Sequence, residues 1–438
     1  MRPDLKRLAV MLVLAALIVL GVVGCGGGGS SSSESTGEAT TAEETEPAAT
    51  EETGEGGEEA SASPLGEEDK ASGEPIQIGM LNLENGPVAF PQVKEAAEAA
   101  IEYVNNYKGG IQGRPLQLSE CATDGQPSTS TRCANQIVEK NPLFILGGAD
   151  TGASGAIPVY ERKGLAYIGG APFTPAESNA KDAATFISVA VGDNAAMAAY
   201  AKEELGAETG VVLQTGDTQG KYTGSIIAKS MEGAGMDVKV ITVSPSASDL
   251  TAPAAEAVAD NADLIYVEVP NACAAMLSAL ESVGNTAKVA AIGTCSAPTV
   301  TEAAGAAAEG VYFPEPVELL SEGSEQAEIT NAAFDEYASK EMPRESLAIA
   351  AFGSVMNAWE VLNEAPESVL EDPSKVLEQF TKGSEHPNWM AHPYTCDRKQ
   401  VPTQEAVCNG YQKIIQFEGG ELHTVSKDWV TGTQFYHP

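Results

Sequence analysis

The stretch FILGGADTGASGAIPVYERKGLAYIGGAP, residues 144–172, decides the fold class of this chain. Two short apolar runs, FILGG and LAYIGG, flank a segment that can form a helix, GAIPVYERKG. Strands that are almost entirely apolar are typical of parallel sheets, because both faces of such a sheet are buried. The stretch therefore predicts a strand, a helix and a second, parallel strand, with glycine-rich loops where the strands end.

The same alternation continues through most of the chain from residue 76. Strand-like runs such as TGVVLQTG and DLIYVEV are separated by alanine-rich segments that predict helices. The pattern occurs twice, over about residues 76–191 and 193–314, and the rest is mainly helical before a hairpin that turns at residues 418–420. We expect an α/β fold with two doubly wound parallel-sheet lobes, hinge crossovers and a ligand cleft between the lobes, since ligands bind at the carboxyl ends of parallel strands.

The first 25 residues have the composition of an export signal. A basic start is followed by an apolar run, residues 8–23, and by VVGC, which ends at Cys25. Because VVGC resembles a bacterial lipoprotein signal box, we expect Cys25 to be lipidated and to hold the protein at the extracytoplasmic face of the cell membrane. An uncleaved anchor is the alternative, and it leaves the protein at the same face.

Residues 26–74 contain almost no large apolar side chains and have one basic residue against fourteen acidic residues. Such a segment cannot bury a core, so we expect a disordered acidic tether. The net charge of the full chain is −37 at pH 7, which makes nucleic acid a very poor partner. Residues 75–438 are more than one compact core usually holds, and this length also predicts two lobes.

Seven cysteines leave six for disulfides once Cys25 is set aside. In an oxidising compartment an even number of cysteines favours disulfides, although six cysteines allow fifteen connectivities. Local spacing favours three pairs, which are Cys121 with Cys133, Cys273 with Cys295, and Cys396 with Cys408. A metal site is disfavoured because the sequence lacks the C-x-x-C spacing of zinc sites, and we expect no metal and no cofactor.

Several segments resemble the leucine/isoleucine/valine-binding branch of the type I periplasmic-binding fold, which serves ABC transporters. These segments are IQIGMLNLENGP (76–87), AAIEYVNNYKGGIQGRPLQL (99–118), the stretch 144–172 and GVYF (310–313). The resemblance covers essentially all of residues 76–438. It implies one lobe of residues 75–192 with about 316–392, and a second of about 193–315 with 393–438. The lobes would close on a small solute and present the closed form to a membrane permease, without enzymatic chemistry.

In the first lobe, the resemblance implies ligand contacts where three strands end. The residues concerned are Asn82, Ala149, Asp150, Thr151, Ala171 and Phe173. In amino-acid binders the loop that matches residues 147–154 holds the ligand carboxylate with a hydroxyl group and backbone N–H groups at a helix start. Asp150 is unexpected there. It either selects a cation or a neutral donor on the ligand, or it caps the following helix and leaves Thr151 to meet the ligand.

In the second lobe, the implied contacts are Gln219, Tyr222, Asn271, Cys295 and Ser296. Relatives often have an aromatic residue where this chain has Gln219, and Tyr222 would compensate if the loop is displaced. Cys295 stands where amino-acid binders keep the acid that pairs with the ligand ammonium. An acid at the carboxylate end and none at the ammonium end indicate either a solute other than a simple aliphatic amino acid or a rearranged site.

These features favour a lipid-anchored, monomeric solute-binding subunit of an ABC importer, with permease and ATPase subunits as partners. The solute would be of the branched-chain amino-acid type or a related small polar organic compound. A sensory protein that hands its closed form to a membrane receptor is the alternative. A secreted hydrolase is less favoured, because GASGA (152–156) lacks the last glycine of G-x-S-x-G and the histidines, of which His423 is the candidate, all fall late in the chain.

Overall fold

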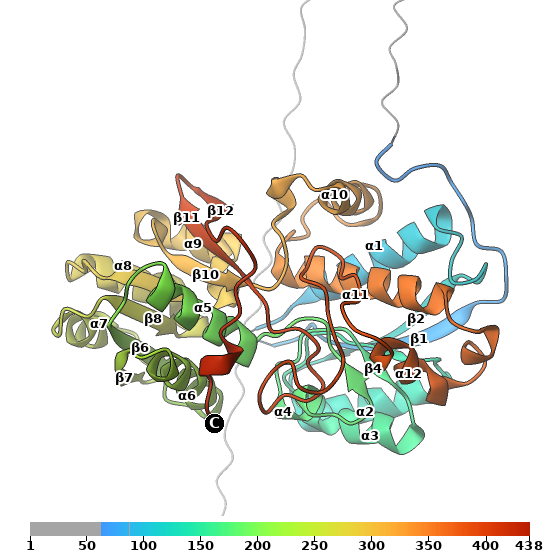
Figure 1. The fold of residues 1–438 in the computed structure, drawn as a ribbon, viewed down its shortest axis with the longest axis horizontal. Helices are drawn as coiled ribbons and strands as arrows, with labels where there is room; N and C mark the ends of the chain where they lie inside the picture. Colours follow the sequence, from blue (N-terminus) through green and yellow to red (C-terminus); the bar gives the residue numbers. More distant parts are fainter. Residues whose placement is uncertain (1–62, 87) are drawn as a thin grey trace, which may run out of the picture. The chain divides into compact units, whose positions relative to one another are not determined.

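Two sheets organise the part of the chain that the computed structural model describes, residues 63–86 and 88–438 (Figure 1). These residues belong to one compact unit. The predicted signal segment, Cys25 and most of the predicted tether lie outside the described residues. The predicted α/β fold with two parallel-sheet lobes is confirmed.

The first sheet has the strand order β2-β1-β3-β4-β5, and all of its pairs are parallel. Its strands are β1 (Ile76–Leu83), β2 (Leu116–Thr123), β3 (Ile145–Leu146), β4 (Tyr167–Ile168) and β5 (Ala183–Ala184). Its helices are α1 (Pro91–Tyr107), α2 (Pro127–Val138), α3 (Ile157–Lys163), α4 (Pro175–Ser178), α10 (Glu325–Tyr337), α11 (Ser346–Asn363) and α12 (Val376–Thr381). Helices α1 and α11 lie on one face and α2 and α3 on the other, which buries the sheet on both sides (Figure 1).

The second sheet has the order β12-β11-β10-β9-β8-β6-β7. Its parallel strands are β6 (Thr209–Thr215), β7 (Asp237–Val243), β8 (Leu264–Glu268), β9 (Lys288–Ala291) and β10 (Tyr312–Glu315). The predicted hairpin is confirmed as β11 (Lys413–Glu418) and β12 (Glu421–Thr424), which add antiparallel to β10. The helices of this lobe are α5 (Val191–Glu203), α6 (Thr218–Gly233), α7 (Thr251–Val258), α8 (Cys273–Ser282) and α9 (Pro298–Ala304).

Strand β8 shows why the apolar runs predict buried parallel strands. Ile265 and Val267 point into one apolar cluster with α7 and α8, whereas Leu264 and Tyr266 belong to the cluster on the opposite face. Both faces of the strand are therefore buried, and every residue from 264 to 268 is shielded from solvent. The one charged residue in the strand is Glu268, at its carboxyl end.

The prediction that residues 26–74 are a disordered tether is wrong for residues 63–74. Leu65, the one large apolar residue of that segment, is only 4% exposed and packs into the core of the first lobe. The backbone N–H of Ala71 donates to the carbonyl of Asn105 over 2.8 Å, and that of Gly73 donates to Gly113 over 2.8 Å. A single buried leucine and these hydrogen bonds attach the segment to α1 and the turn that follows it.

The segment from Tyr394 to Cys408 packs largely on the first lobe, although we expected residues from 393 onward to belong to the second. Its Val401 and Val407 pack with residues of α5 and α6 in the second lobe. Tyr394, Cys396 and Cys408 lie in the core cluster of the first lobe. Thr185, directly after β5, donates its N–H to the carbonyl of Ala406 and accepts from the N–H of Cys408, both over 2.9 Å. We propose that this segment contacts both lobes and that the chain enters the second lobe's sheet only after about residue 409.

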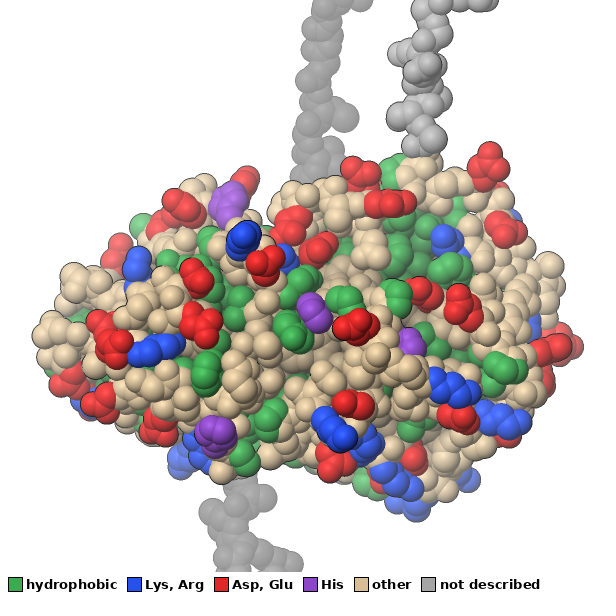
Figure 2. Space-filling view, in the orientation of Figure 1, with side chains coloured by type: hydrophobic (Ala, Val, Ile, Leu, Met, Phe, Trp, Pro, Cys, Tyr) green, Lys and Arg blue, Asp and Glu red, His purple; other side chains and the backbone are tan. Residues whose placement is uncertain are grey.

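All three predicted disulfides are confirmed. They are Cys121–Cys133, Cys273–Cys295 and Cys396–Cys408. The first ties β2 to α2, the second ties α8 to the turn after β9, and the third closes the segment that packs beside β5. Acidic side chains are spread over the face drawn in Figure 2, as the net charge requires.

Candidate functional site

Asp150 is held by its own lobe. The carboxylate is 3% exposed and accepts hydrogen bonds from Thr123 Oγ1 (2.9 Å), Ser130 Oγ (2.6 Å) and the N–H of Gly152 (3.0 Å). Both oxygens are therefore occupied, and the bond to Gly152 forms an Asx turn just before a short 3-10 helix, η1 (Ala153–Gly155). The second predicted role, a helix cap, is not what the structure shows, because the N-caps of η1 and α3 are Gly152 and Ala156 and neither helix has a side-chain cap. Asp150 shapes the loop instead. A direct ligand contact stays a prediction.

Thr151 is the exposed residue of the same loop. It lies beside Gly125, at which a Cβ atom would come within 2.5 Å of Thr151 Oγ1, so the two loops approach closely only because residue 125 is glycine. Ala149 is buried and donates its N–H to Asn82 Oδ1 over 3.2 Å. Thr151 thus remains the hydroxyl group that this loop offers to a ligand.

Asn82 is fully buried at the end of β1. Its Nδ2 donates to the carbonyl of Phe90 over 2.8 Å, while its Oδ1 accepts from Ala149. The side chain therefore joins the loop after β1 to the loop after β3. We expected Asn82 to line the cleft, and the structure places it behind the loops that it connects.

Phe173 is half-buried and stacks on Phe90, with ring centroids 5.6 Å apart and ring planes 25° apart. Ala171 is buried and donates its N–H to the carbonyl of Gly148 over 2.9 Å, so the loops after β3 and β4 run side by side. Phe90 was not predicted from the sequence, where its only signal is an aromatic residue directly after the loop that follows β1. Together the two rings form an aromatic wall at the end of the first sheet.

Glu177 fixes the loop that carries Phe173. Its carboxylate accepts from Tyr167 Oη (3.0 Å) and, in a capping box, from the N–H and hydroxyl groups of Thr174 (2.9 Å each). Complete burial raises the pKa of Glu177 to about 8, although the Thr174 and Tyr167 hydrogen bonds oppose this shift.

In the second lobe, Gln219 is exposed in the first turn of α6. The helix is capped by Asp217, which accepts from the N–H of Gly220 over 2.9 Å, and this bond holds the pKa of Asp217 below its usual value. Tyr222 is half-buried and packs on the apolar cluster that contains Val401 and Val407. Tyr222 as a ligand-covering ring stays a prediction, and its packing against this neighbouring segment argues against it.

Three other predicted contacts follow β8 and β9. Cys295 is buried in its disulfide with Cys273, which removes a free thiol from the site. Ser296 is 6% exposed and donates to the carbonyl of Gly293 over 2.8 Å, whereas Asn271 is exposed in a short 3-10 turn after β8. Asn271 is therefore the most accessible polar group of this set.

Glu268, an acid at the carboxyl end of β8, was not among the residues predicted from the sequence. The side chain is 2% exposed and accepts a hydrogen bond from the N–H of Thr215 over 3.3 Å. Burial raises the pKa of Glu268 to about 8, and the nearby charge of Asp217 adds to the shift. The signal was available, because LIYVEV, residues 264–269, is an apolar run interrupted by one acid.

Gln404 was missed as well, and it lies between the lobes' connecting segments. It is 2% exposed, donates from Nε2 to Ser178 Oγ over 3.4 Å and accepts at Oε1 from Ser188 Oγ over 3.4 Å. The Gln404 side chain also hydrogen-bonds to Tyr222. Burial raises the pKa of Tyr222, and this hydrogen bond partly opposes the shift. No sequence pattern distinguishes it from other glutamines.

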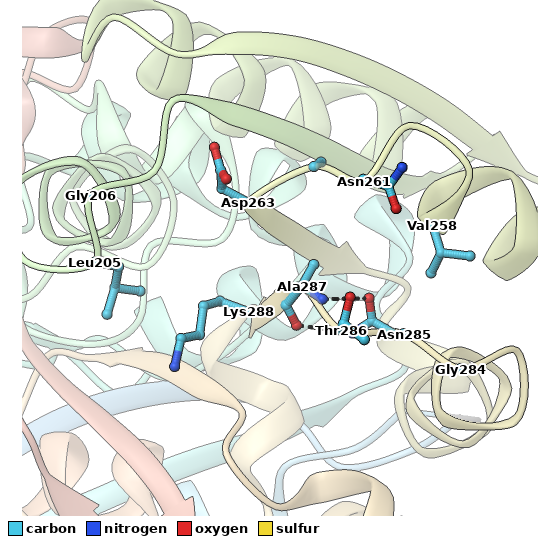
Figure 3. A pocket seen from close by; sticks show the side chains of 11 residues that line it. Leu205, Gly206, Val258, Asn261, Asp263, Gly284, Asn285, Thr286, Ala287 and Lys288 are labelled. Atoms are coloured by element: carbon cyan, nitrogen blue, oxygen red, sulfur yellow. Dashed lines mark hydrogen bonds between the residues drawn. The ribbon is translucent and has the colours of Figure 1, made fainter.

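Two cavities lie away from these residues. One, of about 420 Å³, is at the amino ends of β6, β8 and β9, beside Asn261, Asp263 and Lys288 (Figure 3). The other, of about 190 Å³, lies beside Asp182 and Pro373. Both are at the edges of the sheets opposite to the predicted ligand loops, so neither coincides with the predicted site.

The hydrolase alternative gains no support. Ser154 is exposed in η1 of the first lobe, whereas His423 lies in β12, the edge strand of the second sheet. Among residues 63–86 and 88–438, no three or more His, Cys, Asp and Glu side chains gather in a way that could hold a metal ion. Within those same ranges, every helix is too short or too polar to span a membrane.

Comparison with known proteins gives a consistent result. The sequence profile of the periplasmic binding protein family matches residues 75–400. A segment of 86 residues is 40% identical to Leu/Ile/Val-binding protein homolog 3 of Brucella melitensis biotype 1, and it spans 19% of this chain and 23% of that protein.

Two solved structures share the fold. The branched-chain amino acid transporter substrate-binding protein LivJ of Streptococcus pneumoniae, in complex with isoleucine, has a TM-score of 0.67 at 15% identity and covers 82% of this chain and 100% of its own. The second is a solute-binding protein of an ABC transporter from Rhodopseudomonas palustris, in complex with 3,4-dihydroxybenzoic acid. It has a TM-score of 0.66 at 15% identity, and the match covers 82% of this chain and 98% of that protein.

Proposed function

Because this chain belongs to the periplasmic binding protein family, we propose that it is the solute-binding subunit of an ABC importer. One observation supports this proposal most directly. The structure has two sheets built on parallel strands, with loops at the carboxyl ends of the strands, where ligands bind in such folds, and the chain crosses between the two lobes. A solute that contacts loops of both lobes favours the closed form, since only closure satisfies both sets of contacts.

The solute that we propose is a small organic compound. The relatives' names mention leucine, isoleucine and valine, and one structural neighbour holds an aromatic acid, so the fold alone accepts more than one class. Binding needs no catalytic group, and we propose that the protein is a non-enzymatic monomer that delivers the solute to permease and ATPase subunits.

We further propose an extracytoplasmic protein anchored through Cys25. The family is periplasmic, and VVGC ends at the cysteine that a lipoprotein signal would require. Replacing Cys25 by serine should release the exported chain from the membrane fraction. Retention of the Cys25→Ser variant in that fraction would instead indicate an uncleaved anchor.

A ligand screen on the purified full chain tests the binding function. Each solute class, namely amino acids, amines and carboxylic acids, is added and the unfolding temperature is measured. A solute at about one hundred times its Kd should stabilise the folded chain by about 2.7 kcal/mol, because it binds only the native state. If no class raises the unfolding temperature, the binding function itself is contradicted.

A further inference from the structure

The segments that leave the parallel strands at their carboxyl ends carry acids and no bases. Their charged residues include Glu84, Asp150, Asp217, Glu268 and Glu315. The residues directly at and after the strand ends contain no Lys, Arg or His. These residues are 82–86, 147–152, 169–174, 215–220, 268–273, 292–297 and 314–317. Lys94 and Lys221 follow in the first turns of α1 and α6, so the acids outnumber the bases at this edge, which favours cations over carboxylates.

Glu268 stands out among the buried acids because its hydrogen bonding is incomplete. Asp150 and Glu177 accept hydrogen bonds at both carboxyl oxygens. Glu268 is equally buried, yet among the described residues its one hydrogen-bond donor is Thr215 N–H at 3.3 Å, and none of their ion pairs includes it. A carboxylate has room for about four donors, so most of its capacity is unused.

The location of Glu268 suits a ligand contact. It is the last residue of β8, and its partner in β6 is Gln214. Helix α6 passes over this side of the sheet, since a Cβ at Gly224 would meet Gln214 Oε1 at 2.0 Å. The first turn of α6, capped by Asp217, therefore lies next to the carboxyl end of β8, and the two acids share one corner of the second lobe.

Two more carboxyl groups beside the crossings each have one oxygen without a hydrogen-bond partner. Asp193 Oδ1, in the first turn of α5, and Glu315 Oε1, at the end of β10, are enclosed and accept no hydrogen bond from the described residues. Such groups are rare in native structures and call for a donor or a cation. Burial raises the pKa of both groups, so each is a protonated carboxyl group that a cation could ionise rather than a fixed negative charge.

The first lobe offers little to hold a carboxylate. The loop of Asp150 leads only into η1, of three residues, and α3, of seven residues, and the loop itself contains a buried acid. The helix dipole that would attract an anion is correspondingly weak, and the Asp150 charge opposes it. A zwitterionic amino acid would therefore have its ammonium well placed at Glu268 and its carboxylate poorly placed.

We propose that the solute is an organic amine without a carboxylate, and that Glu268 binds its protonated nitrogen. This inference rests on the proposed binding function and names the solute class of that site. It also differs from the expectation that the second lobe lacks an acid for a cation: the acid is in β8 rather than at position 295.

Ionisation of Glu268 provides a signature. With its pKa raised to about 8 by burial, the unliganded carboxyl group is mostly protonated at pH 7, and an ammonium partner favours the charged form. Amine binding at pH 7 should therefore release close to one proton. Asp217, whose pKa is lowered, and Tyr266, whose pKa is raised well above its usual value, do not duplicate this signal. Burial also raises the pKa of Glu315 to about 8 and that of Asp193 well above its usual value, so loss of proton release in Glu268→Gln is what assigns the proton to Glu268.

The test uses calorimetric titration of the full chain with five probes, namely putrescine, isoamylamine, leucine, isocaproate and 3,4-dihydroxybenzoic acid. We expect the amines to bind most tightly, with proton release seen as a dependence of the binding heat on the buffer's ionisation enthalpy. Glu268→Gln should weaken amine binding at least tenfold. Asp263→Asn is the matched control, since Asp263 precedes the same strand at its amino end, beside the cavity of Figure 3, and this variant should bind as the native chain does.

Other outcomes overturn the inference in distinguishable ways. Binding of isocaproate or 3,4-dihydroxybenzoic acid without binding of amines would refute the amine class and leave the proposed binding function intact. Unchanged amine affinity in Glu268→Gln would refute the role of that residue. If Glu268→Gln does not fold, absence of proton release by the native chain refutes the role equally. Failure of all five probes together with the wider screen would contradict the binding function as well.

Discussion

Ser130 donates a hydrogen bond from its hydroxyl group to Asp150 Oδ2 over 2.6 Å, from helix α2 to the loop after β3. This contact turns the most unusual residue of the predicted ligand loop inward. It also separates the two roles that the sequence left open, because a loop-shaping acid and a ligand-binding acid respond differently to mutation.

Asp150→Ala should lower the free energy of unfolding by about 2 to 4 kcal/mol, because three buried donors lose their acceptor. Urea denaturation measures this change. The affinity of the folded variant for its best solute should fall far less than it does in Glu268→Gln. Native stability with lost binding would show instead that Asp150 contacts the ligand.

Glu177 should make stability depend on pH. Its pKa is about 4.5 when unfolded and about 8 when folded, so between these values the folded chain binds the extra proton. Stability therefore falls as pH rises from 4.5 to 8, by about 1.4 kcal/mol per pH unit from this group, and is level above pH 8. Glutamine can also serve in the capping box, so Glu177→Gln should fold and remove that slope from denaturation curves measured at several pH values. An unchanged slope would contradict the raised pKa.

The disulfides Cys396–Cys408 and Cys121–Cys133 form a matched pair, because each spans 12 residues. Replacing either pair by serine should cost about 2 to 4 kcal/mol by the same effect on the unfolded chain. Only the first closes the segment that carries Gln404 and packs on Tyr222 and β5. Loss of Cys396–Cys408 alone should therefore change the radius of gyration of the unliganded protein in X-ray scattering. Equal effects of both variants would contradict the inference that this segment, which packs on both lobes, influences their arrangement.

Leu65→Ala should destabilise the protein by about 2 to 5 kcal/mol, as expected for a buried leucine. Thermal unfolding measures the loss. Ser72→Ala, at an exposed position of the same segment, is the control and should have little effect. If Leu65→Ala is as stable as the native chain, residues 63–74 do not belong to the fold.

The fold was predictable because its signals are local. Apolar runs such as LFILGG and DLIYVEV report strands buried on both faces, and their spacing requires parallel connections. The three disulfides followed from short spacing for the same reason. The tether prediction failed at Leu65, since a single apolar residue is too weak a signal until the surface that receives it is known.

The candidate site was less predictable. The sequence identified the loops at the strand ends, but not which side chains are free for a ligand. Asn82 and Asp150 have the right chemistry for ligand contacts, yet both are saturated by partners more than twenty residues away or in other elements. Tyr222 has the right position in its loop, and the segment around Val401, far along the chain, covers it.

By itself the sequence determined the α/β class, the two lobes, the disulfide pairs and the acidic character, because each depends on composition, spacing or periodicity along the chain. Only the tertiary structure decided that Asp150 is internally bonded while Glu268 has a single donor. The reason is physical: the availability of a buried polar group depends on which donors the fold brings within about 3 Å, and those donors come from distant parts of the chain.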